Sequence, residues 1–375
     1  MNKRTNLRKP AEFISLLIIP LLIIISAFSS NNVSGWCINT LNFTAFLITP
    51  EEIIKNSDKN NDIIEENSDT ITDSATDTEM TSAPIKLKSD IPDDIRELIE
   101  KAENLYASSS NDGSIDEVDY STKNATAQYE NMYFRNSTLE KEINIADYIN
   151  KDIEADIIKN EPSVLLYHTY TSESYELLDR GFYTNEREVR SDNNKENVVR
   201  IGEEICSVLE SKGYKTIHIT ECFDTQYNGA YERSRQVVSE VLRANPSIQI
   251  VLDIHRDSIY LKEGTRVKTV TEIDGDKVAQ ILITTGCESG NVKDFPNWEK
   301  NLVFALKLQK QLTDDYKALV RPLTITSKKM NMDLIPCALS VEIGTDANTL
   351  TEAIYSSRLF ANSLSEILKE CETNE

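Results

Sequence analysis

The residues of this chain that could do chemistry lie where short apolar runs end. His168 closes the first run, and Glu173 follows it five residues later. Asp253 and His255 lie near the end of a second run, and their side chains share one side because strand side chains alternate with a period of two. Glu342 lies in a third run. Functional groups of open α/β sheets lie beyond the carboxyl ends of the strands, so we expect these side chains to meet.

Two histidines and a carboxylate match the ligand set of hydrolytic zinc sites, which leave one position open for water. A further glutamate could take the proton from that water. Each residue also has a structural explanation: His168 could cap a strand, and Glu342 could cap a helix or lie on the surface. His255 lies between two aspartates, and carboxylates usually orient metal-bound imidazoles. We expect His218, the remaining histidine, to be half-buried structure.

The tripeptide His255-Arg256-Asp257 also mimics the catalytic loop of protein kinases. A kinase needs a glycine-rich loop over the phosphates and further motifs, and the sequence contains none of them. We therefore exclude the kinase class.

From about residue 161 onwards, apolar strands alternate with amphipathic helices. This alternation predicts an α/β domain with a mainly parallel sheet and helices on both faces. Asp274-Gly275 predicts a hairpin turn. The expected strands are Val164–His168, Tyr214–Ile219, Ile248–His255, Val267–Glu272, Val278–Thr285, Leu319–Thr326 and Ala338–Ile343, and the expected helices are Asn197–Lys212, Tyr231–Ala244, Trp298–Tyr316 and Leu350–Lys369.

The N-terminal residues 1–36 predict a membrane anchor with a short cytoplasmic tip. Four basic residues precede the apolar run Phe13–Phe28, and such a flank stays in the cytoplasm. The alternative is a signal peptide cleaved near Ala27-Phe28-Ser29. Either way, the rest of the chain is exported.

Residues 37–160 predict an acidic, disordered, low-complexity linker with possible short helices. Residues 51–118 contain 19 acidic and 6 basic residues. A segment with such an excess of like charge repels itself and extends. Pro92–Tyr106 has apolar residues at helical spacing. The whole chain carries a formal charge of −22, which argues against binding to nucleic acid.

Several ordered motifs carry a resemblance to one family. They are Leu165–Tyr175 (LLYHTYTSESY), Tyr231–Ser234 (YERS), Asp253–Asp257 (DIHRD), Pro296–Trp298, Asn301-Leu302, Arg321-Pro322, Val341–Gly344 (VEIG) and Asn348-Thr349. Together they resemble the stage II sporulation protein P family of peptidoglycan hydrolases, over roughly residues 161–370. That family also has an N-terminal membrane anchor and a variable spacer.

The resemblance implies that residues 161–375 form a zinc-dependent N-acetylmuramoyl-L-alanine amidase domain with an amidase-3-like fold and additional endopeptidase activity. His168 and His255 match the zinc-binding histidines, and Glu342 matches the catalytic glutamate. The third ligand is Glu173 or Glu196, and we favour Glu173.

Other site residues follow from the same resemblance. Arg256 is a candidate helper for the oxyanion, and Asn331 and Asp257 are candidates for substrate binding. Two departures from the family pattern stand out: Tyr170 replaces a usual histidine, and Met330-Asn331-Met332 replaces the usual Tyr-Asn-Gln. If the histidine at position 170 were an essential ligand, this site would lack one. Because the two-histidine ligand set needs only His168 and His255, we expect the change to be tolerated.

The family context implies action on peptidoglycan during engulfment, with stage II sporulation proteins D and M as partners. It also implies a single-pass protein of the septal or engulfing cell membrane, with its catalytic domain outside the cytoplasm. Two alternatives remain open. One is a non-catalytic, peptidoglycan-binding scaffold, and the other is a different zinc amidohydrolase or carboxypeptidase.

Overall fold

The computed structural model describes residues 91–138, 140–261 and 264–373, all within one compact unit, Ser82–Glu375. The expected anchor, residues 1–36, and the first part of the expected linker lie outside the described residues. None of the helices described is long and apolar enough to span a membrane. These helices are α4 (Asp93–Leu105), η1 (Ile145–Asp147), α5 (Val198–Ser211), α6 (Ala230–Ala244), α7 (Trp298–Tyr316) and α8 (Leu350–Glu370).

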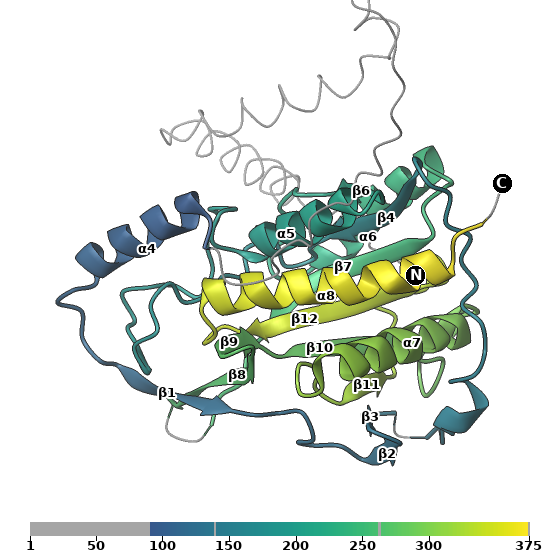
Figure 1. Ribbon diagram of the computed structural model, residues 1–375, viewed down its shortest axis with the longest axis horizontal. Coiled ribbons are helices and arrows are strands. Elements are labelled where there is room, and N and C mark those ends of the chain that lie inside the picture. Colours follow the sequence, from purple (N-terminus) through teal and green to yellow (C-terminus); the bar gives the residue numbers. More distant parts are fainter. Residues whose placement is uncertain (1–90, 139, 262–263, 374–375) are drawn as a thin grey trace, which may run out of the picture. The chain divides into compact units, whose positions relative to one another are not determined.

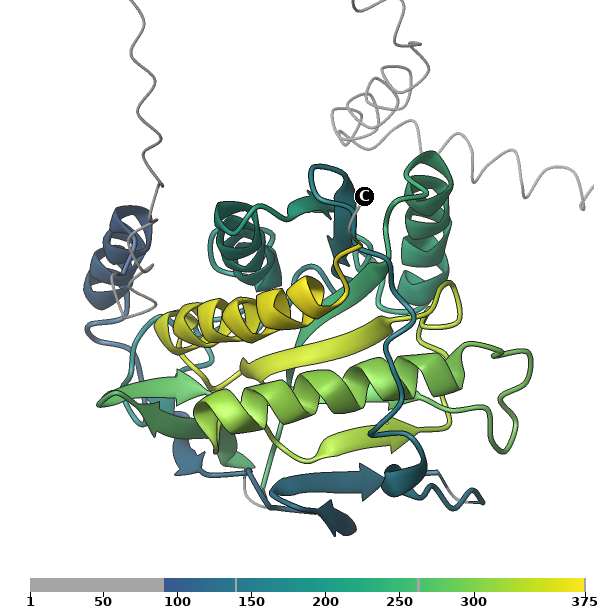
Figure 2. The same ribbon diagram turned by 45° about the vertical axis from the view of Figure 1, so that its right-hand side comes forward.

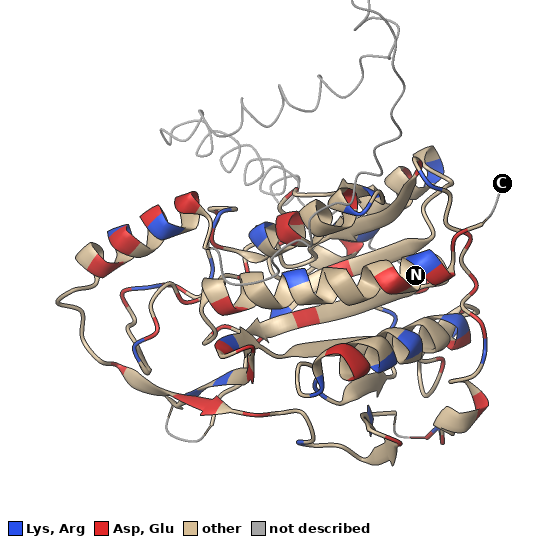
Figure 3. Cartoon of the chain, viewed as in Figure 1, with Lys and Arg blue, Asp and Glu red and all other residues tan. Residues whose placement is uncertain are grey.

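An eight-stranded sheet forms the centre of this unit (Figure 1). Its strands, in spatial order, are β2 (Ala127–Tyr129), β3 (Met132–Asn136), β11 (Leu323–Thr326), β10 (Ile281–Gly286), β12 (Ala338–Thr345), β7 (Ile250–Asp257), β4 (Pro162–Tyr167) and β6 (Lys215–His218). Nearly all residues of β4 and β7 are buried, as expected for strands covered on both faces. Charged residues lie mainly on helices and loops, and β4 and β10 carry none (Figure 3).

The sheet is mixed, which corrects the expected mainly parallel sheet. β12, β7, β4 and β6 run parallel to one another, and β10, β11 and β3 form a second parallel group. The two groups meet antiparallel at β10 and β12, and β2 is antiparallel to β3. The connection from β11 to β12 contains no helix, and without a crossover helix a returning strand can run in the opposite direction.

Three of the described helices cover the sheet as one layer, and the expected cover on both faces stays a prediction. α5, α7 and α8 pack on one another in one layer, and α6 stands apart from it (Figure 2). α5 begins at Asn197, whose side chain accepts a hydrogen bond from Val199 N. α8 begins at Thr349 with a capping box that Glu352 completes. The sequence boundaries of these helices agree with the prediction within one or two residues.

A smaller sheet contains β5 (Phe182–Tyr183), β1 (Gly113–Val118), β8 (Arg266–Ile273) and β9 (Asp276–Ala279), in that order. β8 and β9 form the predicted hairpin, and Asp274 and Gly275 both have positive φ, as a tight two-residue turn requires. The expected strand Val278–Thr285 is wrong as a single strand. It is divided at Gln280 into β9 and β10, which belong to different sheets.

The folded unit extends upstream of the boundary predicted at residue 161. β1 pairs with β8, and β3 pairs with β11 at the edge of the central sheet. Met132 and Phe134 of β3 are each 1% exposed, so they belong to the core. Part of the expected linker therefore takes part in both sheets, because a few apolar residues suffice where a neighbouring strand edge supplies the hydrogen bonds.

The predicted helix around residues 92–106 is confirmed as α4, and it packs on the folded unit. Ile95 is fully buried, and Asp94 forms an ion pair with Arg200 of α5 at 3.5 Å. The Arg180 side chain donates to the carbonyl oxygen of Tyr106 at the end of α4.

Because Phe134 is buried in the core, we predict that Phe134→Ala destabilises the protein by about 3–5 kcal/mol. The neighbouring Arg135 is exposed, so Arg135→Ala should change the free energy of unfolding by less than about 0.5 kcal/mol. Thermal and urea unfolding of residues 82–375 measure both values. Equal, small effects would show that β3 is not part of the core.

Candidate active site

A hydrogen-bonded turn follows β4 and decides which side chains enter the site. Glu173 N donates to the carbonyl oxygen of Tyr170, which closes the turn. Asp253 of β7 anchors its start, because it accepts from the backbone N and the hydroxyl of Thr169 at 2.9 and 2.7 Å. The alternation of a strand therefore ends at Tyr167, and beyond it the turn sets the direction of each side chain.

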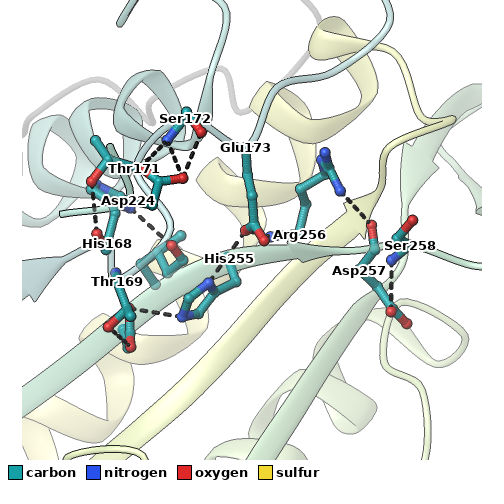
Figure 4. Close-up of polar contacts among 12 residues, drawn as sticks. His168, Thr169, Thr171, Ser172, Glu173, Asp224, His255, Arg256, Asp257 and Ser258 are labelled. Atoms are coloured by element: carbon teal, nitrogen blue, oxygen red, sulfur yellow. Dashed lines mark hydrogen bonds and ion pairs between the residues drawn. The ribbon is translucent and has the colours of Figure 1, made fainter. Parts of the chain in front are cut away.

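His255 lies between two carboxylates (Figure 4). Its Nδ1 is 3.2 Å from Glu173 Oε2, and its Nε2 is 2.9 Å from Asp253 Oδ1. Glu173 also accepts from the backbone N of Arg256 at 3.1 Å. Burial alone would lower the pKa of His255, but Asp253 and Glu173 outweigh it and raise this pKa well above its ordinary value. Asp253 and His255 thus lie on the same side of β7, as expected.

His168 faces away from this pair. Its Nδ1 is 2.9 Å from the carbonyl oxygen of Ile254, and its Nε2 is 2.8 Å from Nε2 of His218. Both imidazoles lie against Gly202 of α5, where a Cβ atom would come within 3 Å of either ring. Burial holds the pKa of His168 well below its ordinary value and lowers that of His218 to about 4. The two histidines form a neutral pair, and half-buried His218 is placed as expected.

The expected zinc ligands His168, Glu173 and His255 therefore do not converge. Both ring nitrogens of His168 have other partners, and only Glu173 and His255 touch each other. In the described part of the chain, no group of three or more His, Cys, Asp or Glu side chains is placed to hold a metal ion. The donor set in this structure does not fit the expected zinc site, and zinc binding by these three residues stays a prediction.

Tyr170 occupies the space beside His255. Its ring centroid is 5.7 Å from that of His255. The ring stacks on Tyr227 at 4.9 Å and meets Tyr231 of α6 edge-on at 5.8 Å. The guanidinium of Arg190 lies within 6 Å of the Tyr170 and Tyr227 ring centroids. The departure at position 170 thus lies in the site, next to Glu173 and His255.

Glu342 lies on β12 directly opposite His255 in the register of the two strands. Its buried Oε2 has no hydrogen-bond partner within the described residues. Burial, with a contribution from the charge of Asp257, raises the pKa of Glu342 to about 8. A carboxyl group with such a pKa can exchange protons near neutral pH, as general acid–base catalysis requires.

Glu173 and Glu196 have different surroundings, which distinguishes the two candidates for the third ligand. Glu173 contacts His255, as described above. Glu196 instead accepts from the Ser191 hydroxyl at 2.7 Å and pairs with Arg187 at 3.3 Å. Glu173 is therefore the carboxylate that the fold brings to His255.

The guanidinium of Arg256 holds the backbone around the site. It donates to the carbonyl oxygens of Ser174, Val189 and Asp257, at 2.8, 2.6 and 3.2 Å. Ser174 directly follows Glu173, so these bonds help to fix that glutamate. A contact between Arg256 and an oxyanion stays a prediction.

Asn331 and Asp257, the expected substrate-binding residues, both have protein partners. Asn331 donates to the hydroxyl of Ser234 at 3.0 Å and to the carbonyl oxygen of Tyr231 at 3.2 Å, which links its loop to α6. Asp257 forms an ion pair with Arg321 at 2.8 Å. Their roles toward a substrate stay predictions.

Comparison with known proteins places this chain in a family. The model of the stage II sporulation protein P (SpoIIP) family matches residues 53–365. The chain belongs to the SpoIIP family. Stage II sporulation protein P of Bacillus subtilis (strain 168) is 28% identical over 254 residues, which cover 62% of this chain and 60% of that relative. The family resemblance of the sequence motifs is thereby confirmed.

Two amidases are among the solved structures to which this chain is similar. One is the N-acetylmuramyl-L-alanine amidase Ami1 from Mycobacterium smegmatis, with 11% identity, a TM-score of 0.34, and coverage of 57% of this chain and 100% of that one. The other is the CwlD amidase from Clostridioides difficile in complex with the GerS lipoprotein, with 12% identity, a TM-score of 0.33, and coverage of 56% and 98%.

Sequence reasoning missed three residues of the site, and for two of them a signal was present. Tyr231 and Arg321 belong to motifs that this chain shares with the SpoIIP family, but no chemistry followed from their residue types alone. Tyr227 has no such signal. It lies in the loop before α6, and only the folded loop brings its ring onto Tyr170.

In metal-free protein, we predict that Glu173→Gln lowers the pKa of His255, because it removes one of the two carboxylates that stabilise the imidazolium. Glu196→Gln is the matched control and should leave this pKa unchanged, because Glu196 pairs with Arg187. Imidazole nitrogen shifts in an NMR pH titration measure both. A similar shift in the two variants would contradict the site described here.

Proposed function

We propose that this SpoIIP-family chain is a cell-wall hydrolase that acts on peptidoglycan during sporulation. The reacting centre would be the group formed by Glu173, His255 and Glu342. Membership of the SpoIIP family supports action on peptidoglycan during sporulation. The ability of Glu342 to exchange protons beside His255 supports hydrolysis. The proposed reaction does not use zinc, because His168 does not join Glu173 and His255 in a ligand set.

The observation that carries this proposal is the state of Glu342. This carboxyl group has a pKa raised to about 8, a buried oxygen without a partner, and a position opposite His255. As a general base, its ionised form would take the proton of the attacking water and pass it to the leaving amine. His255, held between Asp253 and Glu173, would supply positive charge beside the reacting atoms.

The scissile bond in this proposal is the amide between the lactyl group of N-acetylmuramic acid and L-alanine. Endopeptidase cleavage within the stem peptides is an additional proposed activity. The proposed place of action is the engulfing membrane, with residues 1–36 as anchor and the described unit outside the cytoplasm. Stage II sporulation proteins D and M are the proposed partners.

A second candidate function is peptidoglycan binding without cleavage. The observation that favours it is Tyr170, which lies beside His255 where the SpoIIP family usually carries a histidine. A chain that kept the fold but lost a metal ligand could still bind the cell wall and position other hydrolases there.

Digestion of purified sacculi separates the two functions. We predict that the wild-type protein releases soluble stem peptides with a free N-terminal L-alanine, detected by mass spectrometry. A different new terminus would identify a carboxypeptidase or another amidohydrolase. Binding to sacculi without any release would contradict the proposed hydrolase and support the binding function.

Glu342→Gln tests the role of the base. The amide keeps the size of the side chain but accepts no proton, so release should fall about 10²–10⁴-fold while binding to sacculi stays unchanged. Because only the ionised carboxyl group accepts a proton, wild-type activity should rise as the pH passes about 8, and the variant should lack this rise. Near-normal release by Glu342→Gln would remove this residue from the reaction.

A further inference from the structure

We infer that residue 170, and not His168, is the third member of a metal site formed with Glu173 and His255, and that Tyr170 leaves this site one donor short. A histidine at position 170 would complete a zinc site. The inference concerns metal binding and does not depend on the proposed hydrolysis.

The spacing of the two existing donors fits a shared metal ion. His255 Nδ1 and Glu173 Oε2 are 3.2 Å apart. Two ligands of a tetrahedral zinc ion, each about 2.0–2.1 Å from the metal, lie about 3.3–3.4 Å from each other. The pair therefore already has nearly the separation that two zinc ligands need.

The surroundings of the pair also match a metal-binding histidine and carboxylate. Asp253 lies 2.9 Å from Nε2 of His255, on the side of the ring opposite Glu173. A carboxylate at this distance favours a proton on Nε2, which directs metal binding to Nδ1, the nitrogen that faces Glu173. Glu173 is oriented in turn by the backbone N of Arg256. Both donors are thus held in place without a third ligand.

The turn after β4 excludes His168 and presents position 170. His168 lies against Gly202 of α5, whereas Thr169 bonds to Ser234 of α6 and Tyr170 packs on Tyr231 of the same helix. The Tyr170 and His255 ring centroids are 5.7 Å apart. Zinc in proteins is held by cysteine, histidine and carboxylate ligands, so the tyrosine contributes no ordinary donor there.

Metal titration of the full-length chain tests this inference, with Zn²⁺ alone as the ligand and Co²⁺ as a spectroscopic probe. Losing a group that merely orients a metal ligand already costs about 10–100-fold in affinity. We therefore expect Tyr170→His to bind Zn²⁺ at least about 100-fold more tightly than the wild type, with one ion per chain. The Co²⁺ form should show the absorption of a tetrahedral site.

Three controls make the result specific. Tyr227→His adds an imidazole to the same aromatic cluster, but Tyr227 contacts Tyr170 rather than His255, so it should bring no gain. Removing His255 from the Tyr170→His variant should abolish the gain. Replacing His168 by asparagine in that variant should leave the zinc affinity unchanged, because His168 faces α5.

Two outcomes would overturn the inference. One is tight, stoichiometric zinc binding by the wild type that is lost in His168→Asn. The other is no gain in affinity by Tyr170→His and none by Tyr170→Asp, which offers a smaller donor at the same place, with both variants folded by circular dichroism. Release of stem peptides is measured separately, so failure of the proposed hydrolase would leave the metal result unaffected.

Discussion

The carboxylate of Asp253 is the group on which the rest of the site depends. It is 1% exposed, and it binds both the start of the turn after β4, through Thr169, and the imidazole of His255. A buried carboxylate with several partners is costly to disturb, because any lost partner leaves charge without compensation. One side chain thus fixes the direction of residues 168–173 and the orientation of the histidine that faces Glu173.

Much of the fold could be predicted from the sequence. Helices such as Trp298–Tyr316 have a long apolar stripe, and strands such as β4 are short, nearly apolar runs. The reversal between β10 and β12 could not be predicted, because β10 is buried along nearly its whole length, like the parallel strands β4 and β7. The role of β1–β3 could not be predicted either, since short strands with few apolar residues depend on pairing with distant residues such as those of β8 and β11.

The site was predicted in part. Glu173, Asp253, His255 and Glu342 lie where the ends of β4, β7 and β12 bring them together, as the strand-end argument requires. His168 was misplaced because the alternation of β4 was extended one residue too far. A turn with an i to i+3 hydrogen bond redirects the side chains after Tyr167, and the sequence Thr169–Ser172 contains no glycine or proline that would announce it.

The arrangement of the site depends on two side-chain directions that this turn imposes, with His168 toward α5 and Tyr170 toward His255. Nuclear Overhauser effects in the side-chain-labelled protein measure these directions most directly. We expect this arrangement to give contacts from the His168 ring to Gly202 and His218, and contacts from the Tyr170 ring to His255. Contacts between the rings of His168 and His255, with none from His168 to Gly202, would contradict it.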